Sequence, residues 1–146
     1  MGVDAVVFKS LQTLPAMEAS DVAAVRVDEM TGEAYFASEH GVPLRREDVI
    51  ATERRLGNAS LISALRKEVG RSLGDNYSSL LLSKVLYDGT HSGDTIRPED
   101  LDVLKQELFV LKNHETQQSR ELHEFMSNME ELIRAAQQHG NPIVFV

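Results

Sequence analysis

The strongest structural signal in the chain is an apolar stripe close to its C-terminal end. Between residues 122 and 136 apolar side chains recur at intervals of three and four, with charged residues between them. This spacing places them on one face of an α-helix and predicts that this face packs into a core. Gly140 and Pro142 then end the helix, because glycine suits a left-handed terminal residue and proline cannot continue a helix. The stripe comprises Leu122, Phe125, Met126, Met129, Leu132, Ile133 and Ala136.

Short apolar segments at the two ends of the chain predict β-strands. Residues 3–8 and 143–146 are both rich in β-branched and aromatic side chains. We expect these two strands to pair with each other. A hairpin is predicted from strands at 22–27 and 34–37, with Gly32 in the turn.

Further helices are predicted between these strands. Residues 46–56 suit a short charged helix ended by Gly57, and a second helix begins from Asn58 on, with Asn58 and Ser60 both suited to the N-cap. A third begins near Asn76 or Ser78, and a fourth has Pro98 in its first turn.

These elements predict one α+β domain spanning residues 1–146. We expect a small, mostly antiparallel sheet of three to four strands, with about five helices packed on one side. The chain has no internal repeat and no linker long enough to divide it.

The net charge of −8 and the lack of cysteine limit the classes of function. Binding to nucleic-acid phosphates needs clustered Lys and Arg, so we do not expect this acidic chain to bind nucleic acid. Its N-terminal segment has no basic stretch followed by a long apolar run, so neither a signal peptide nor a membrane span is expected. A chain without cysteine suits a reducing compartment, and we expect it in the cytoplasm.

The most polar candidate for a functional site is the segment 87–94, YDGTHSGD, between two predicted helices. It gathers a histidine, hydroxyl groups and carboxylates around two glycines, and loops held on a rigid scaffold often carry function. The candidate binding residues are Tyr87, Asp88, Thr90, His91, Ser92 and Asp94.

This loop is open to more than one interpretation. Residues 89–93 miss the G-x-S-x-G spacing of a nucleophile elbow by one position and lie between helices. Asp88, His91 and Asp94 offer oxygen and imidazole ligands to a metal, but the other histidines do not add to them. The glycine dipeptides are typical of turns, and Asp94 and Thr95 suit the cap of the next helix. The pattern favours a helix joint that can also bind, and we assign no catalytic residue, metal ligand or cofactor.

In three short stretches the chain resembles small uncharacterised bacterial proteins, some of which are thought to be toxin immunity proteins. The stretches are the N-terminal strand after MGVD, the joint GTHSGD at 89–94 and the terminal strand IVFV at 143–146. The resemblance implies a protein that binds another protein, and it assigns no functional residue.

The sequence leads to three hypotheses for function. The acidic charge, without a recognisable catalytic constellation, favours a non-enzymatic binding module, such as an immunity or regulatory protein that neutralises a basic partner such as a toxin. The first alternative is a small enzyme or ligand-binding domain that uses the loop 87–94, with His91 lining an open pocket. The second is a structural homodimer, which requires the apolar stripe at 122–136 to be exposed.

Overall fold

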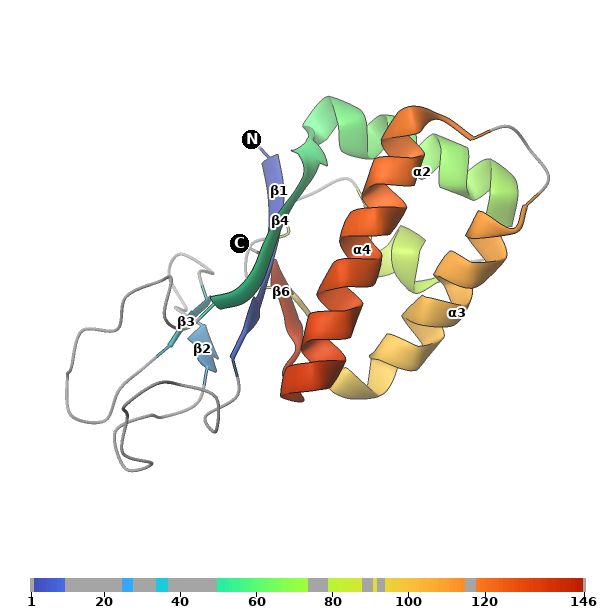
Figure 1. Ribbon diagram of the computed structural model, residues 1–146. Helices are drawn as coiled ribbons and strands as arrows, with labels where there is room; N and C mark the ends of the chain where they lie inside the picture. Colours follow the sequence, from blue (N-terminus) through green and yellow to red (C-terminus); the bar gives the residue numbers. More distant parts are fainter. Residues whose placement is uncertain are drawn as a thin grey trace.

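One antiparallel sheet organises the protein, seen in a computed structural model that describes residues 2–9, 25–27, 34–36, 50–73, 79–87, 91, 94–114 and 118–145. Its strands lie in the spatial order β4-β1-β6-β5 (Figure 1). They are β1 (Gly2–Phe8), β4 (Ile50–Asn58), β5 (Thr95–Ile96) and β6 (Ile143–Phe145). The expected hairpin is confirmed for its described part, because β2 (Val25–Val27) pairs antiparallel with β3 (Ala34–Phe36) as a separate ribbon.

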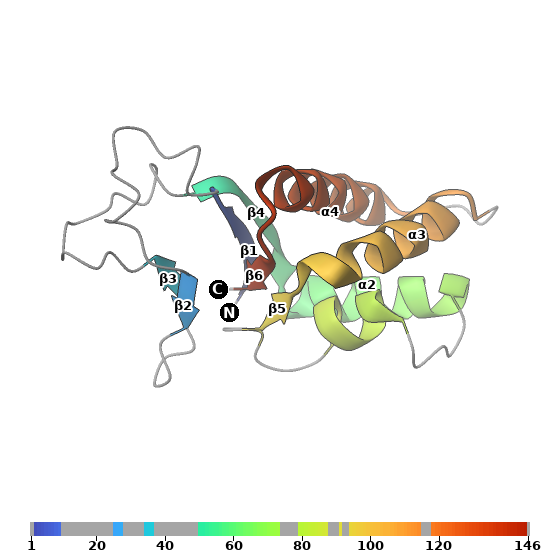
Figure 2. The same ribbon diagram turned by 90° about the horizontal axis from the view of Figure 1, so that it is seen from below.

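The helices cover one side of the four-stranded sheet, as Figure 2 shows from below. They are α2 (Ala59–Leu73), the π-helical turn η2 (Leu81–Val85), α3 (Leu101–Lys112) and α4 (Arg120–His139). The 3-10 turn η3 (Pro98–Asp100) leads directly into α3, so Pro98 lies in a first helical turn as predicted. The α+β class is confirmed, and with η3 counted as part of α3 the described residues form four helices instead of about five.

The strand β1 lies inside the sheet, between β4 and β6, and both of its faces are apolar. Val3, Ala5 and Val7 belong to the core cluster that the helices cover. Val6, on the opposite face, pairs with Val144 of β6, and both side chains are also buried. The predicted pairing of the first and last strands is therefore confirmed.

The helix predicted at residues 46–56 is wrong for its described part, because Ile50–Asn58 forms the strand β4 along the full length of β1. The charged residues of this segment favour a helix locally, but pairing with an apolar neighbouring strand overrides that preference. Gly57 lies within this strand and does not end a helix; its φ is 149°. A Cβ at Gly57 would approach the Leu61 side chain to 2.7 Å, so this position has no room for a larger residue.

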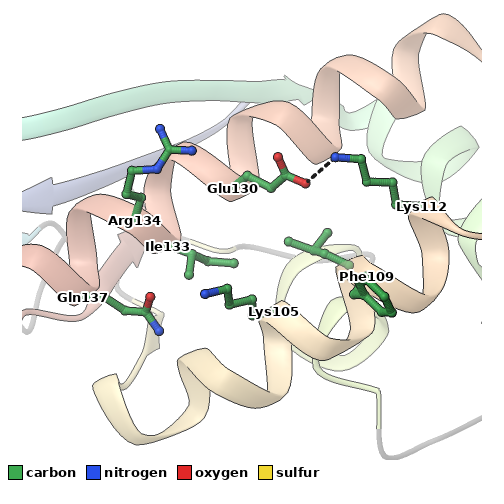
Figure 3. A pocket seen from close by; sticks show the side chains of 8 residues that line it. Lys105, Phe109, Lys112, Glu130, Ile133, Arg134 and Gln137 are labelled. Carbon is green, nitrogen blue, oxygen red and sulfur yellow. Dashed lines mark hydrogen bonds and ion pairs between the residues drawn. The ribbon is translucent and has the colours of Figure 1, made fainter.

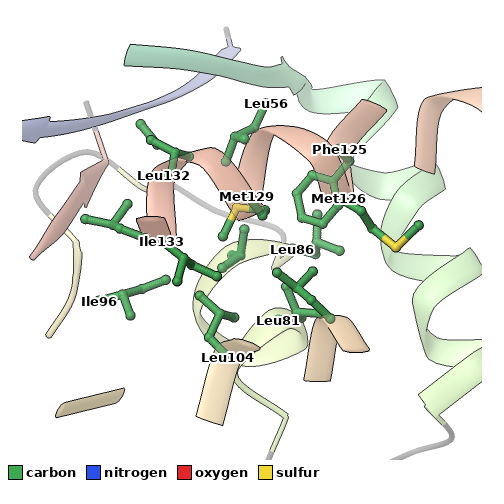
Figure 4. Close-up of a cluster of buried hydrophobic side chains, with 14 of the residues drawn as sticks. Leu56, Leu81, Leu86, Ile96, Leu104, Phe125, Met126, Met129, Leu132 and Ile133 are labelled. Atoms are coloured by element: carbon green, nitrogen blue, oxygen red, sulfur yellow. The ribbon is translucent and has the colours of Figure 1, made fainter. Parts of the chain in front are cut away.

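The core is built around α4, and the predicted stripe on this helix faces inward (Figure 4). Its side chains pack between the sheet and the other helices, where Leu56, Leu81 and Leu104 contribute from three further elements. The homodimer hypothesis required this stripe to be exposed, and that requirement is not met. The buried residues of the stripe are Leu122, Phe125, Met126, Met129, Leu132, Ile133 and Ala136.

Both ends of α4 follow from the local sequence. The Ser119 side chain caps the first turn by accepting a hydrogen bond from the Leu122 amide at 3.1 Å. Gly140 ends the helix with a φ of 65°, in the left-handed region, as the sequence predicts.

Candidate functional site

Three of the six candidate loop residues, Tyr87, His91 and Asp94, are placed by the structure and contact one another in pairs. The Tyr87 hydroxyl donates a hydrogen bond to the Asp94 carboxylate. The rings of Tyr87 and His91 stack with their centres 4.0 Å apart and their planes 29° from parallel. Asp88, Thr90 and Ser92 lie outside the described residues.

The His91 ring points into the protein and is only 5% exposed. Its Nε2 lies 2.7 Å from the carbonyl oxygen of Val85, and Phe145 of β6 meets the ring edge-on with centres 5.9 Å apart. A carbonyl oxygen can only accept, so Nε2 must carry the hydrogen. Nδ1 is buried and has no hydrogen-bond partner in the described part of the chain.

These contacts give His91 a structural role at the end of η2. Val85 is the last residue of η2, where carbonyl groups lack partners within the helix, and the imidazole supplies one. The loop is fixed further because the Asp94 amide donates to the His91 carbonyl, and the Asp94 carbonyl accepts from the Phe145 amide, each at 2.9 Å. The described residues of the loop therefore join η2 to the strand β5, and the burial of His91 does not favour the enzyme alternative.

The suggestion that Asp94 and Thr95 cap the next helix is wrong. Thr95 begins the two-residue strand β5, which pairs with β6. The Asp94 carboxylate is bound by Tyr87, and the following turn η3 begins after Arg97 without a side-chain cap. These residues join the edge of the sheet instead. Their pairing depends on β6, which is far away in the chain.

The start of η2 is bound by a residue that sequence reasoning missed. Glu107, on α3, accepts hydrogen bonds from the Ser79 hydroxyl and from the amides of Leu80 at 2.9 Å and Leu81 at 3.4 Å. An anionic group is stabilised at a helix N-terminus because the first amides there have no partner within the helix. Side chains from elsewhere therefore bind η2 at both ends.

The second missed carboxylate is Glu68 on α2, which binds the start of α4. Its two oxygens accept from the amide of Ser119 at 2.8 Å and from the hydroxyl of Ser119 at 2.6 Å. Nothing in the local sequence marks Glu68 or Glu107, since each acts on a segment far away in the chain. Both carboxylates hold helix starts in place.

The electrostatics of the loop hold Tyr87 in its neutral form. Burial, the hydrogen bond to Asp94 and the charge of Asp94 together raise the pKa of Tyr87 to about 12. The phenol therefore acts as a hydrogen-bond donor at neutral pH and not as a base. Among the described residues, no three His, Asp or Glu side chains are grouped so that they would hold a metal ion.

A more exposed feature lies on α3, which carries three large apolar side chains on its outer side. Val103 is 51% exposed, Phe109 64% and Val110 53%. Val103 and Val110 are seven positions apart and so lie on one face of the helix, whereas Phe109 lies on the flank towards α4. The inward side of the same helix carries the buried residues Leu101, Leu104, Leu108 and Leu111.

A groove runs along each flank of α3. The groove towards α2, a cavity of about 390 Å³, is lined by Leu73 of α2 together with Val103, Gln106, Glu107 and Val110 of α3 and two serines. The groove towards α4, of about 320 Å³, has the Leu108 and Ile133 side chains among its lining, with Phe109 at its side (Figure 3). Both volumes lie near the lower end of the range for small-molecule sites. Among the described residues, the large exposed apolar side chains all lie on α3.

None of the described helices is both long enough and apolar enough to cross a membrane. Comparison of the chain with protein-family models, with curated proteins and with solved structures gives no match.

Proposed function

We propose that this protein is a non-enzymatic binding module that docks another protein against the outer side of α3. The observation that carries the proposal is the exposure of Val103 and Val110 on one face of that helix. Single exposed apolar residues are ordinary, but two on one helical face beside a groove of mixed apolar and polar lining favour a partner surface. The cytoplasm is its proposed compartment, since the chain has no cysteine.

The contacts made by the described residues of the loop 87–94 support this proposal. The His91 imidazole, the Tyr87 hydroxyl and the Asp94 carboxylate are occupied in holding η2 and the sheet edge. An enzyme needs groups that can reach a substrate, and a ring that is 5% exposed beneath a tyrosine cannot do so without a movement of the loop. The binding role therefore fits these contacts better than catalysis.

The partner is proposed to be basic. The chain carries a net charge of −8, which attracts a positively charged protein and speeds its encounter. An immunity or regulatory protein that neutralises a basic toxin has this character. If the charge acts in this way, the association rate falls steeply with ionic strength while the dissociation rate changes little.

Site-specific photo-crosslinking in cells of the source organism tests the docking face. A benzophenone amino acid is placed at Val103 or Val110, and at Glu124 on the exposed side of α4 as the matched control. The proposal predicts an adduct with one protein from both α3 positions and none from Glu124. The added substitution Val110→Asn should remove the adduct formed through position 103 and leave the circular dichroism of the protein unchanged.

Three outcomes contradict the proposal. The first is an equal adduct from Glu124, which would mean non-specific contact. The second is the absence of any adduct from α3. The third is an adduct consisting of two copies of the chain, which would instead support a homodimer through α3.

A further inference from the structure

The groove between α3 and α4 combines an apolar lining with positive charge. Leu108 and Ile133 are among the residues that line it, and both are almost completely buried, so they form its floor. Phe109 stands at its side with much of its ring free, so it can cover a bound apolar group (Figure 3). Apolar walls with a few polar groups at the rim are typical of small-molecule sites.

The rim of this groove is positively charged, although the chain as a whole is acidic. Three cations, Lys105, Lys112 and Arg134, line it with the anion Glu130, and the carboxylate of Asp102 is bound to Gln137 at the same rim. Lys112 and Glu130 form a long ion pair of 3.5 Å across the two helices. Neither Lys105 nor Arg134 has an ion pair or hydrogen bond with another residue of the described part. Two cations are therefore available to an anion.

The positions of these groups define the ligand. Figure 3 shows the Lys105 side chain directed across the groove towards Ile133 and Gln137, so its ammonium group lies beside the apolar lining. The amide nitrogen of Gln137 is held by Asp102 at 3.2 Å, which leaves the carbonyl end of Gln137 as an acceptor. An ammonium group beside apolar side chains favours a carboxylate attached to an apolar body.

We propose that the α3–α4 groove binds a small organic carboxylate with an apolar body, of the size of a medium-chain acyl or an aromatic acid. The carboxylate lies at Lys105 and within reach of Arg134, and the apolar body lies beside the exposed ring of Phe109, over the floor formed by Leu108 and Ile133. The cavity of about 320 Å³ has the size of a small-molecule site. This site lies on the opposite flank of α3 from the proposed docking face and does not depend on it.

Titration of the isotope-labelled full chain with octanoate, followed by amide chemical shifts, tests the site. Octylammonium serves as the control because it has the same chain with the opposite charge. Saturable shifts are expected with octanoate at 105, 108, 109, 133, 134 and 137, and only weak, unsaturated shifts with octylammonium. Lys105→Glu is expected to weaken octanoate binding by about tenfold or more, because it replaces an attraction by a repulsion.

The matched control variant is Arg120→Glu, which reverses an exposed charge on α4 outside the groove. Its affinity for octanoate should equal that of the unchanged protein. Lys105→Gln, a milder change, keeps the test valid if Lys105→Glu fails to fold. Equal binding of octylammonium, equal weakening by Arg120→Glu, or shifts centred elsewhere would overturn the proposal. Saturation by an acidic amphipathic peptide with no response to octanoate would overturn it in favour of a protein segment.

Discussion

Removing the carboxylate of Glu107 is expected to destabilise the fold, although this residue lies on the outer part of α3. Glu107 binds the start of η2 through the hydroxyl of Ser79 and the amides of Leu80 and Leu81. Ser79 is itself 4% exposed, so its hydroxyl loses a partner where water is largely excluded. The substitution Glu107→Ala therefore affects both a helix start and a buried hydroxyl.

The magnitude follows from these contacts. Loss of an N-terminal cap costs about 0.5–2 kcal/mol, and leaving a buried donor unsatisfied costs about 1–3 kcal/mol. The bond to the Leu81 amide is 3.4 Å long and adds little. Glu107→Ala is thus expected to lower the free energy of unfolding by about 2–4 kcal/mol. Glu107→Gln keeps one accepting oxygen and should lose about half as much, roughly 1–2 kcal/mol.

Urea unfolding followed by far-ultraviolet circular dichroism measures this loss. With a urea slope of about 2 kcal/mol per molar, a loss of about 3 kcal/mol lowers the midpoint by about 1.5 M. Glu124→Ala is the matched control, because Glu124 is also a helical glutamate but forms only an exposed pair with Arg120. That control should change the free energy of unfolding by less than about 0.5 kcal/mol. If Glu107→Ala and Glu124→Ala unfold at the same urea concentration, Glu107 does not act as a cap.

Three further predictions concern the loop and the end of α4. The Nε2 atom of His91 should carry a hydrogen, because the Val85 carbonyl can only accept, and long-range nitrogen–carbon correlation spectra that show Nε2 without a hydrogen would contradict this assignment. The pKa of Tyr87 is raised to about 12, so its contribution to stability is complete below the ordinary tyrosine pKa of about 10 and is lost as the pH rises from there to 12. In an ultraviolet titration one tyrosine should ionise late, and Tyr87→Phe, which cannot donate to Asp94, should remove that step. Gly140→Ala should lower the free energy of unfolding, measured in urea, by about 1 kcal/mol. Gly140 has a φ of 65°, which strains any residue with a Cβ, although the space around it is open. An unchanged urea midpoint would contradict this prediction.

The parts of the fold that the sequence predicts are those whose signals are local. α4 combines a regular apolar stripe with a serine cap and a terminal glycine, and all three are found in the structure. The first and last strands are short, apolar and β-branched, so they are recognisable without knowledge of their partners. Asn58 likewise caps α2 as predicted, since its side chain accepts from the Leu61 amide at 2.9 Å.

The part that local signals miss is the strand β4. Its charged residues, among them Arg54 and Arg55, are acceptable in a surface helix. Arg54 reaches α4 instead, where it forms an ion pair with Glu131, and each of these side chains remains 42% exposed. The strand is stabilised by β1 and by α4, which lie about fifty and eighty positions away in the chain. A pattern confined to residues 46–56 contains neither partner and therefore cannot predict the strand.

The same distinction explains why the polar residues of the loop resemble a site. A domain with several short helices has many helix ends inside it, and each end leaves amide or carbonyl groups that need partners. Here His91 binds the last carbonyl of η2, Glu107 binds its first amides and Glu68 binds the start of α4. Histidine and glutamate are also common in active sites, but here the Nε2 of His91 and the carboxylates of Glu107 and Glu68 already have hydrogen-bond partners. On α3, in contrast, Val103 and Val110 are exposed, and Lys105 has no partner in the described part of the chain. This helix therefore has side chains that are free to contact another molecule.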